Sequence, residues 1–498
     1  MAVLGGDSCR FLATVTVETK TKRVTVKKTQ RPLVIDLDGT LLKTDTLLEL
    51  MLAFIRMRWV NVFILTGLLF RDRATMKAEL AKRTAIDVSQ FPLRNQVMDL
   101  IQNARESGRT VVLATASDLA IAEAISDKVV PFDEVFASTP GTNLKGHTKA
   151  EALVARFGDK GFDYVGNDTP DLVVFHKAHT AYVVEPSASL MRRASVSNPT
   201  IETLGESPVI ARSLVRSLRP HQWVKNLLIF LPALAAQSLA LDNALPLIAA
   251  FVLFSAMASA VYITNDLLDL SSDRVHPTKK NRPFASGSVP IPVGLVASPL
   301  LGLGALAGSW LVLGPRFTAV LATYAFITLA YSLWLKRIVL VDVFTLSGLY
   351  GIRLVAGAVA FDIPISPWLA AFATFAFLSL ALVKRFAEMS DNDQAEGTLP
   401  GRGYLTTDAP LIALFGVVSG FVGGVVLALY AEDPDTVDTY ANPLVLWVAV
   451  PVWLFWISRT WFMAHRRTLR EDPVLFAVTD WPSYVAGALI ATAFLLAR

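Results

Sequence analysis

The apolar residues of this 498-residue chain are distributed unevenly, and their distribution divides the chain into two parts. Over residues 1–210, short apolar runs alternate with charged segments, which is typical of a soluble mixture of helices and strands. From residue 222 onward, long apolar runs follow one another with short charged loops between them, as in proteins that cross a membrane several times. A chain of this length is also expected to form two or three domains. We therefore predict a soluble α/β part followed by an all-α membrane part.

Several apolar segments of the second part are candidates for transmembrane helices, because a helix needs about 20 apolar residues to cross a bilayer. The nine segments lie near residues 226–241, 244–264, 290–313, 315–334, 339–361, 366–383, 411–430, 442–462 and 482–497. Lys and Arg collect in the loops on one side of these segments, and an acidic loop lies on the other side. The positive-inside rule makes the basic side cytoplasmic, so an odd number of spans leaves the C-terminus outside.

Composition changes this picture little. The single cysteine, Cys9, excludes a framework of internal disulfides. No signal peptide is apparent, since residues 1–18 lack a basic start followed by an apolar core. The soluble part is therefore expected to stay in the cytosol. The net charge of +4 is small, no nucleic-acid partner is expected, and the sequence leaves the oligomeric state open.

An acidic segment follows the second predicted span. It reads Asn265-Asp266-x-x-Asp269-x-x-x-Asp273, so its three carboxylates would share one face of a continuing helix. Like charges placed side by side repel one another, and a cation must hold them together. Ligands that are all oxygen favour Mg²⁺, which often bridges to the phosphates of a substrate. We therefore predict a Mg²⁺ site here, and the alternative is a solvated acidic loop between two membrane helices.

The fifth predicted span contains two ionisable residues, Asp342 and Arg353. An ionisable side chain at membrane depth is costly and usually faces a polar cavity. Arg353 is accordingly a candidate for binding an anion. The alternative is that its long side chain extends to the lipid headgroups.

The soluble part contains a pair of acids directly after a short apolar run, in the segment RPLVIDLDGTLL (31–42). Residues two apart on a strand face the same way, so Asp36 and Asp38 are expected to point into one site beyond the strand. Gly39 permits the tight turn that follows. Two adjacent carboxylates can share the work of phosphoryl transfer, because one attacks phosphorus while the other carries the proton.

The long apolar run Leu47–Phe70 could be read as another membrane span. Spanning would separate Asp36 and Asp38 from the rest of their site by a bilayer. It would also leave Arg56 and Arg58 in the middle of the segment, where burial in lipid is costly. We predict instead a helical hairpin that lies on the membrane surface or on the soluble domain itself.

The soluble part resembles the haloacid dehalogenase-type phosphatases. Its DLDGT segment is similar to the first motif of that family and VVLAT (111–115) to the second. The helix that opens at Lys149 is similar to the third motif, and FDYVGNDTPDL (162–172) to the fourth. The resemblance implies a Rossmann-like α/β fold with a helical cap near residues 44–100.

The same resemblance assigns roles to individual side chains. It implies that Asp36 attacks phosphorus and that Asp38 carries the proton. The other implied site residues are Thr115 and Lys149 for phosphate and Asp36, Asp38 and Asp171 for Mg²⁺. Asn167 departs from the family pattern, because it stands where the first Mg²⁺-binding aspartate is usual, and it can lend an oxygen but no charge.

The membrane part resembles the UbiA-type intramembrane prenyltransferase superfamily over about residues 210–498. The resemblance rests on the NDxxDxxxD segment after the second span and on RPHQWVKN (219–226). It implies a helical bundle that binds a diphosphate through Mg²⁺ held by acidic loops at its cytoplasmic mouth.

One departure narrows this second resemblance. Prenyl-transferring members usually carry another acidic motif, DxxxD, at the fifth span, whereas this chain has Asp342 followed by Leu346. One branch of the superfamily, the decaprenyl-phosphate phosphoribosyltransferases of cell-wall arabinose synthesis, is similar to this chain in several further segments. These segments are residues 276–287, 340–360, 384–388 and 471–477. In that branch a lipid phosphate is the acceptor and 5-phosphoribosyl diphosphate is the donor.

Both substrates carry phosphates, which need cationic and polar ligands. The candidates for substrate binding are Lys225, Asn265, Lys279, Lys280, Arg282, Asp342, Arg353, Lys384 and Arg385, and the metal ligands would be Asp266, Asp269 and Asp273.

The combined interpretation is a multi-pass protein of a bacterial inner membrane, surrounded by membrane lipids. The expected divisions are a tail (1–31), a phosphatase-like domain (32–200), a linker (201–210) and a membrane transferase domain (211–498). The membrane half would move 5-phosphoribose from 5-phosphoribosyl diphosphate to a polyprenyl (decaprenyl) phosphate, and the soluble half would remove the ribose 5-phosphate. Three alternatives stay open: prenyl transfer to an aromatic acceptor, a lipid carrier or ion pathway, and a soluble domain that is only a regulatory or structural module.

Overall fold

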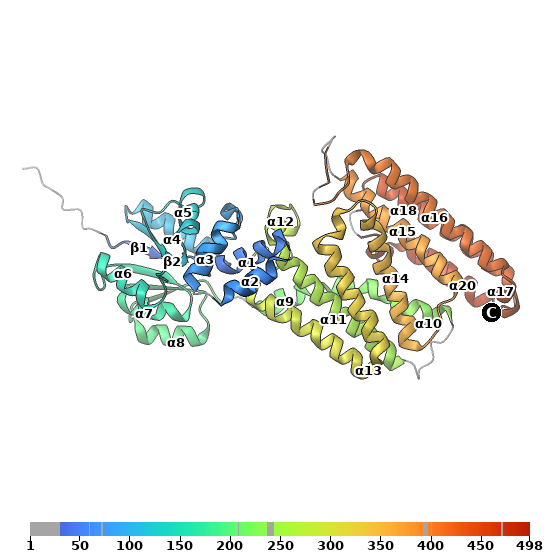
Figure 1. Cartoon of the computed structure of the whole chain (residues 1–498), viewed down its shortest axis with the longest axis horizontal. Coiled ribbons are helices and arrows are strands. Elements are labelled where there is room, and N and C mark those ends of the chain that lie inside the picture. Colours follow the sequence, from blue (N-terminus) through green and yellow to red (C-terminus); the bar gives the residue numbers. More distant parts are fainter. Residues whose placement is uncertain are drawn as a thin grey trace, which may run out of the picture.

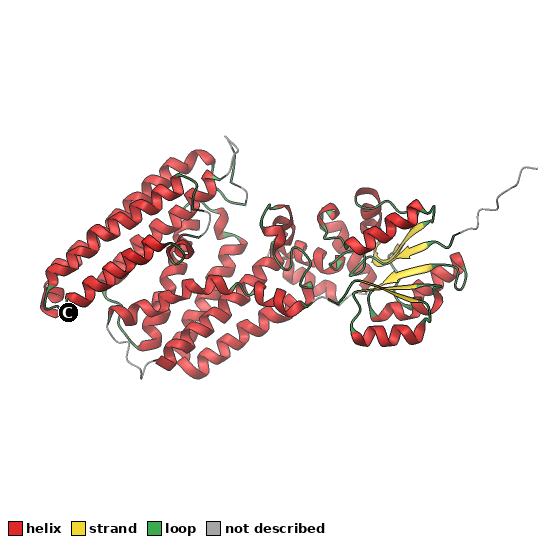
Figure 2. Cartoon of the chain, turned by 180° about the vertical axis from the view of Figure 1, so that it is seen from behind, coloured by secondary structure: helices red, strands yellow, loops and turns green. Residues whose placement is uncertain are grey.

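The computed structural model of the chain describes residues 30–498 except 59, 71–72, 208, 237–243, 392–396, 400 and 470–471. A soluble half that contains all the strands of this described part is followed by a helical half (Figures 1 and 2). Three sequence predictions fall wholly or partly outside the described residues. They are the N-terminal tail up to residue 29, the end of the first predicted span and Glu471 of the segment 471–477.

The soluble half is built on one sheet of six parallel strands in the order β3-β2-β1-β4-β5-β6. The strands are β1 Leu33–Ile35, β2 Val111–Asp118, β3 Glu134–Ser138, β4 Asp163–Gly166, β5 Ala181–Val184 and β6 Ile201–Leu204. The central strand β1 is apolar at every position because both faces of a parallel sheet are covered. Leu33 and Ile35 pack on one side of the sheet and Val34 packs on the other.

Helices form a layer on each face of this sheet. One apolar core contains residues of α4 and α5, and the opposite core contains residues of α6, α7 and α8. Their bounds are α4 Asn95–Glu106, α5 Leu119–Lys128, α6 His147–Phe157, α7 Leu172–Lys177 and α8 Ala188–Ser197. The α/β fold predicted for this half is therefore confirmed as a three-layer, parallel-sheet domain.

The linker predicted at 201–210 begins too early. Residues 201–204 form β6, which pairs with β5 along its whole length, so only the segment between Gly205 and α9 (Ile210–Ser217) connects the halves. The polar sequence Glu202-Thr203 resembles a linker because β6 lies at the edge of the sheet, where one side of a strand faces solvent.

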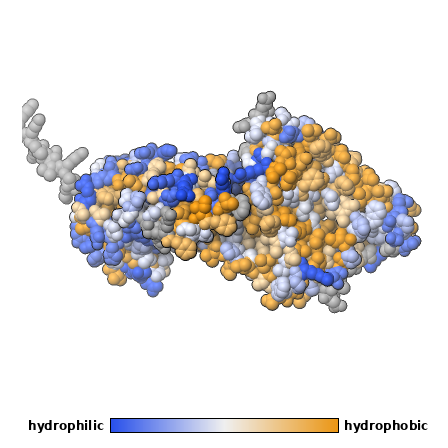
Figure 3. All heavy atoms as spheres, in the orientation of Figure 1, coloured by the Kyte–Doolittle hydropathy of each residue, from blue (hydrophilic) through white to orange (hydrophobic). Residues whose placement is uncertain are grey.

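The apolar run 47–70 does not form one long helix. It is divided into α1 Thr46–Met57 and α2 Asn61–Leu69, and α3 Arg73–Arg83 follows. Leu50 and Phe54 of α1 pack into the soluble core, while Leu52 packs against the membrane half. Figure 3 shows apolar side chains on the surface over α1 and α2. The hairpin therefore docks on both halves, and neither helix is long enough to cross a membrane.

The membrane half consists of long apolar helices. Its elements are α9 Ile210–Ser217, α10 Leu231–Ala235, α11 Ala244–Leu268, α12 Leu270–Val275, α13 Ile291–Leu333, α14 Val341–Phe361, α15 Pro367–Ser390, α16 Ala409–Glu432, α17 Pro434–Thr439, α18 Ala449–His465, α19 Pro473–Ala477 and α20 Trp481–Leu496. In the described part of the chain, six helices are long and apolar enough to cross a membrane. The chain is thus a multi-pass membrane protein.

The longest of the six, α13, holds two of the predicted spans. Its backbone is non-helical at Gly314, and the Oγ of Ser309 lies only 2.9 Å from the Oγ1 of Thr318. Nine residues of straight helix would separate these two positions by about 13 Å along the axis, so the chain turns back at Gly314. The segments predicted near 290–313 and 315–334 therefore correspond to the two legs of α13.

The total of nine spans is not confirmed. The first predicted span begins as a 3₁₀ helix, Pro220–Phe230, followed by the short α10, and its end lies outside the described residues. The last one, α20, has 16 residues and is shorter than a full span. The number nine therefore stays a prediction.

Candidate active sites

The acid pair of the soluble half lies at the carboxyl end of β1. Asp36 is 7% exposed, and its Oδ1 accepts a hydrogen bond of 2.7 Å from the Nζ of Lys149. The same Nζ donates to the Tyr164 hydroxyl at 3.0 Å, which in turn donates to Asp171 Oδ1 at 2.8 Å. The structure thus brings Asp36, Lys149 and Asp171 together. It adds Tyr164, which sequence reasoning missed because an apolar strand does not reveal which side chain reaches the site.

Asp38 is held by donors from two other segments. Its Oδ1 accepts from the backbone N–H of Thr46 at 2.8 Å, and its Oδ2 accepts from Ser117 Oγ at 2.5 Å. Of the two hydroxyls on β2, the one that bonds the acid pair is therefore that of Ser117 and not that of Thr115. Thr115 is fully buried, and its Oγ1 accepts from the Ser117 N–H at 3.0 Å. Thr115 consequently orders the turn that presents Ser117, a residue that the motif comparison had passed over.

Asn167 lies directly against the acid pair. Its Oδ1 accepts from Thr40 Oγ1 at 3.0 Å, and the same hydroxyl is 3.2 Å from Asp36 Oδ2. A Cβ at Gly39 would come within 2.4 Å of the Asn167 amide nitrogen, so only glycine fits there, and its φ of +72° also suits glycine. Asn167 is thus bonded to the turn that follows Asp38.

The acids of this site do not form the predicted Mg²⁺ cluster. Among the described residues, no three His, Cys, Asp or Glu side chains are grouped closely enough to hold a metal ion. Asp171 uses both oxygens within the protein, because Oδ2 accepts from the backbone N–H groups of Asn167 and Asp168. Neutral Asn167 adds no charge. The residues present therefore do not fit a Mg²⁺ site built on three carboxylates. Any phosphoryl transfer at this site would rely on the protein's own side chains.

Burial alters the protonation of the acid pair. It raises the pKa of Asp36 to about 7, against the opposing effect of Lys149 and with a contribution from Asp171. Burial also raises the pKa of Asp38, and neighbouring Asp45 adds to the rise. A carboxyl group with a raised pKa can hold a proton near neutral pH, which is what a general acid requires.

The acid pair opens into a cavity of about 360 Å³ that lies at the boundary between the two halves. Its cationic lining includes Lys43, Lys77 and Lys145. Residues 290–292, the Pro-Ile-Pro segment at the start of α13, complete the wall. The two halves approach closely here, since a Cβ at Gly287 would come within 2.5 Å of the Lys43 Cβ. The cavity of the soluble half is therefore partly built by the membrane half.

The acidic segment of the membrane half lies at the end of α11, where the helix stops. Asp269 separates α11 from α12, so the three aspartates do not share one face of a continuous helix as predicted. Arg282 bridges Asp266 Oδ1 at 3.1 Å and Asp273 Oδ2 at 2.6 Å, and Arg219 also contacts Asp266 Oδ1. The cations that hold these carboxylates are side chains of the protein.

Two oxygen atoms of this segment nevertheless remain available to a metal ion. Asp266 Oδ2 and Asn265 Oδ1 are buried and have no hydrogen-bond partner in the described part of the chain. A buried unpartnered oxygen is costly, and carboxylate and amide oxygens are ligands that Mg²⁺ accepts. These two residues, with Asp269 beside them, would therefore be the ones to hold a Mg²⁺ ion, although here too no three acids of the described residues are grouped closely enough to bind one by themselves.

Arg353 is buried inside the helical bundle. Its Nε donates to Asn226 Oδ1 at 2.9 Å, it also donates to the Leu349 carbonyl, and its guanidinium lies over the rings of Phe254 and Tyr324. Only 4% of Arg353 is exposed. The alternative interpretation, in which its side chain extends to the lipid headgroups, is therefore not supported. A buried guanidinium with neutral partners leaves a positive charge inside the bundle.

Two lysines meet one aspartate close to Arg353. Lys225 Nζ lies 2.8 Å and Lys384 Nζ 2.9 Å from the same atom, Asp472 Oδ2, and the Tyr350 hydroxyl donates to Asp472 as well. Although burial opposes it, Lys384 and Lys225 hold the pKa of Asp472 well below its usual range. The sequence resemblance included the segment around Asp472, but it did not indicate which side chains Asp472 contacts.

A second network of ion pairs contains two residues that were predicted to bind substrate. Arg385 and Asp342 are both fully buried, with Nε and Oδ2 2.6 Å apart, and Arg402 lies 3.3 Å from the other oxygen of Asp342. Arg385 also contacts Glu388. Because these charges already balance one another, the structure favours a packing role for Asp342 and Arg385 and not the predicted contact with substrate. Lys279 and Lys280, by contrast, lie exposed in the loop after α12.

Comparisons with known proteins agree with both halves. A family model described as haloacid dehalogenase-like hydrolase matches residues 33–170, and one described as the UbiA prenyltransferase family matches residues 226–398. The protein y4nM of Sinorhizobium fredii is 37% identical over 94% of this chain and 91% of its own length. The chain belongs to the UbiA prenyltransferase family and carries an N-terminal haloacid dehalogenase-like domain.

Two further relatives of this UbiA-family chain match smaller parts of it. Nodulation protein NoeC of Azorhizobium caulinodans is 35% identical over 56% of this chain and 91% of its own length. Decaprenyl-phosphate phosphoribosyltransferase of Mycobacterium tuberculosis is 38% identical over 36% of this chain and 61% of its own length. The match to y4nM extends over 94% of this chain and so includes both halves. The two domains are therefore joined in that relative as well.

Proposed function

We propose that the membrane half transfers 5-phosphoribose from 5-phosphoribosyl diphosphate to a polyprenyl phosphate. We further propose that the soluble half removes the 5-phosphate from the product. The observation that carries the first step is the pair of lysines, Lys225 and Lys384, that contacts the single carboxylate of Asp472, with the buried Arg353 bonded to the neighbouring Asn226. The similarity to a decaprenyl-phosphate phosphoribosyltransferase supports the choice of substrates.

These residues carry more positive than negative charge. Lys225 and Lys384 contact the one carboxylate of Asp472, while the buried guanidinium of Arg353 has neutral partners, and an uncompensated buried charge costs several kcal/mol. A phosphate monoester carries a charge of about −1.5 to −2 near neutral pH and offers three strong acceptor oxygens. The phosphate of a lipid acceptor would therefore supply the charge that these residues lack, while its chain lies among the apolar helices.

The donor would bind at the acidic end of α11. Asn265, Asp266 and Asp269 are the residues that would hold Mg²⁺, which neutralises the charge that develops on departing pyrophosphate. In the transfer, one phosphate oxygen of the lipid forms a bond to C1 of the ribose as the bond from C1 to the diphosphate breaks. The acceptor is already an anion, so the step needs no base. Lys225, Lys384 and Arg353 would hold and orient that anion.

The soluble half would act on the product by covalent catalysis. Asp36 attacks phosphorus, the bond to the ribose 5-oxygen breaks, and Asp38 gives its proton to that oxygen. Lys149 neutralises the phosphoryl oxygens, and Asp38 then takes a proton from the water that hydrolyses the aspartyl phosphate. The wall formed by residues 290–292 supports a lipid-linked substrate, because the cavity then opens where such a lipid would emerge.

The alternative of prenyl transfer to an aromatic acceptor finds less support. It needs a second acidic motif to hold the diphosphate of the prenyl donor. Asp342 is the one acid at that place, and it is engaged with Arg385 and Arg402, while Leu346 is apolar.

Membranes that contain the protein, incubated with labelled 5-phosphoribosyl diphosphate and polyprenyl phosphate, provide the test. Wild-type protein should release pyrophosphate and form lipid-linked ribose without a 5-phosphate. Asp36→Asn should accumulate the 5-phosphorylated lipid, and Asp159→Asn, an exposed acid of the same domain, should behave as wild type. Absence of any labelled lipid would refute the transfer step. Accumulation of the 5-phosphorylated lipid by wild-type protein would refute the hydrolysis step alone.

A further inference from the structure

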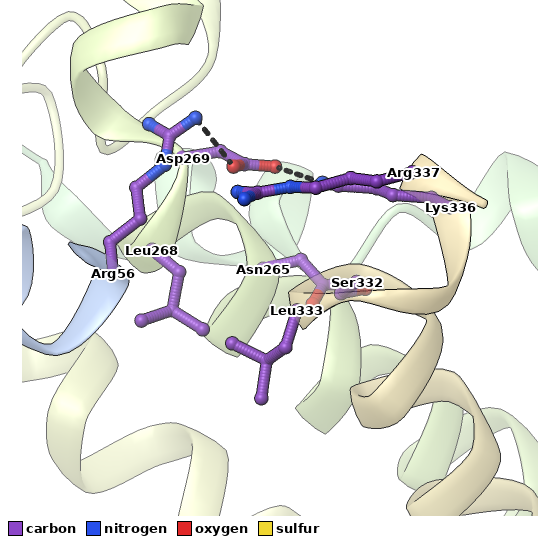
Figure 4. A pocket seen from close by; sticks show the side chains of 8 residues that line it. All are labelled: Arg56, Asn265, Leu268, Asp269, Ser332, Leu333, Lys336 and Arg337. Carbon is purple, nitrogen blue, oxygen red and sulfur yellow. Dashed lines mark ion pairs between the residues drawn. The ribbon is translucent and has the colours of Figure 1, made fainter. Parts of the chain in front are cut away.

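A shallow pocket lies between the two halves, next to the acidic end of α11 (Figure 4). Arg56 of the soluble half reaches it from one side, and Lys336 and Arg337 of the membrane half reach it from the other. Asp269 lies between them, 3.4 Å from Arg56 Nη2 and 3.6 Å from Lys336 Nζ. Asn265 also lines the pocket. One wall of this site is therefore contributed by the phosphatase-like half.

The pocket carries an excess of positive charge. Three cations line it together with the single carboxylate of Asp269. In addition, Asn265 Oδ1 is buried here without a partner in the described part of the chain. Excess cations and an unpartnered oxygen together indicate a place for an anion accompanied by a hard cation.

Arg56 is held at this place by the packing of α1. Glu49, Leu52 and Arg56 are three and four residues apart and so lie along one face of that helix. Leu52 packs into the apolar cluster at the end of α11, and Glu49 pairs with Arg274. Arg56 Nη1 also donates to Ser271 Oγ at 3.0 Å. The same helix also forms part of the soluble core, so the position of Arg56 depends on how the halves dock.

We propose that Arg56, Lys336 and Arg337 form a diphosphate-binding subsite shared by the two halves, so that the soluble half completes the donor site of the transferase. The ligand class is the diphosphate of a soluble activated sugar, an identification that rests on the proposed function. A guanidinium donates two parallel hydrogen bonds to neighbouring phosphate oxygens, which a lysine cannot reproduce. Arg56 would exchange Asp269 for these oxygens when the ligand binds.

Binding of inorganic pyrophosphate with Mg²⁺ to the full chain in nanodiscs of neutral lipid tests the subsite directly. Arg56→Ala should weaken this binding about 10- to 100-fold, as expected for the loss of charge-assisted hydrogen bonds. Arg56→Lys should recover only part of the loss. Arg58→Ala is the matched control, since Arg58 ends the same helix and is exposed, and it should bind pyrophosphate as wild type.

Three further measurements separate the outcomes. Protease sensitivity of the segment 205–209 reports whether the halves stay docked, and it should be unchanged in Arg56→Ala. In transfer assays Arg56→Ala should raise KM for 5-phosphoribosyl diphosphate more than it lowers kcat. Nanodiscs that contain anionic lipid test the other source of phosphate, a lipid headgroup. If Arg56→Ala changes retention of anionic lipid and leaves pyrophosphate binding intact, the proposal is overturned.

The subsite and the proposed function can fail separately. If wild-type protein transfers no phosphoribose but Arg56→Ala still loses pyrophosphate binding, the subsite stands and the choice of reaction is wrong. If transfer occurs and Arg56→Ala binds pyrophosphate normally, or if Arg58→Ala loses as much, the subsite is wrong.

Discussion

Arg274 Nη2 lies 2.6 Å from Glu49 Oε1, and this ion pair joins the two halves of the protein. Both side chains are only 6% exposed. Thr44, which lines the phosphatase-like cavity, donates to the same Glu49 oxygen at 2.5 Å, and Arg274 directly follows Asp273 of the acidic segment. One buried contact thus connects the surroundings of both candidate sites.

Glu49→Gln should loosen the docking of the halves. Removing one partner of a buried ion pair leaves the other charge unpaired and costs about 3–5 kcal/mol. The variant should have a lower Tm and a more protease-sensitive connection at 205–209. Glu79→Gln is the control, because Glu79 pairs with Arg83 within α3 in a partly exposed i,i+4 pair, which is worth only about 0.3–0.5 kcal/mol. Equal behaviour of the two variants would contradict the role of Glu49 in docking.

Arg353→Lys should be nearly as damaging to transfer as Arg353→Ala. Arg353 contacts Asn226, the Leu349 carbonyl and two aromatic rings through one planar group, and an ammonium cannot make these contacts at once. We expect at least a 10-fold loss of transfer at subsaturating lipid for each variant. Arg316→Ala, at an exposed arginine, should leave transfer unchanged. Full activity in Arg353→Lys would show that only the charge matters.

The phosphate-binding role of Lys225 and Lys384 predicts opposite effects for two substitutions. Lys225→Met removes a cation and should weaken binding of inorganic phosphate, whereas Asp472→Asn removes the competing anion and should strengthen it. The measurement is the rise of Tm with added phosphate, which grows with affinity for the folded protein. A smaller rise in Asp472→Asn than in wild type would contradict the assignment.

Asn167→Asp should raise the Mg²⁺ affinity of the soluble half. The substitution places a further carboxylate beside Asp36, within reach of the Thr40 hydroxyl that already bonds Asn167. Hard cations prefer charged oxygen ligands, so hydrolysis by the variant should rise with added Mg²⁺, whereas hydrolysis by the wild type, whose residues do not fit a site of three carboxylates, should not. Asp159→Asn serves as control, since that acid is exposed, pairs with Lys177 and does not line the cavity. An unchanged Mg²⁺ profile would show that residue 167 does not face a metal ion.

The α1–α2 hairpin should contact lipid at its far end. Phe70 is 92% exposed, and the α2 residues Val62 and Ile64 are more than 40% exposed, which is unusual for apolar side chains in water. In a Cys9→Ser background, a fluorophore on Phe70→Cys should be quenched by brominated lipids. The same label on Val196→Cys, which is 89% exposed on α8, should not be quenched. Equal quenching at both positions would contradict this placement of the hairpin.

Much of the fold and part of each site could be read from local spacing. Residues two apart on a strand face the same way, so the sequence predicted that Asp36 and Asp38 lie together. The apolar runs located the long helices of the membrane half. The rejection of a span at Leu47–Phe70 also followed from sequence, because its charges forbid burial in lipid. These features depend on neighbours within a few residues, which is the range that a sequence pattern can report.

The sequence by itself therefore determined which residues carry charge and which segments are apolar, and tertiary structure alone decided the partner of each charge. Lys225 meets Asp472 from 247 positions away, Glu49 meets Arg274 across the domain boundary, and α11 ends where a continuing helix had been expected. The physical reason is that an ion pair forms between any opposite charges that folding brings within about 4 Å. Packing of the whole chain sets that proximity, and the spacing of residues along the chain does not.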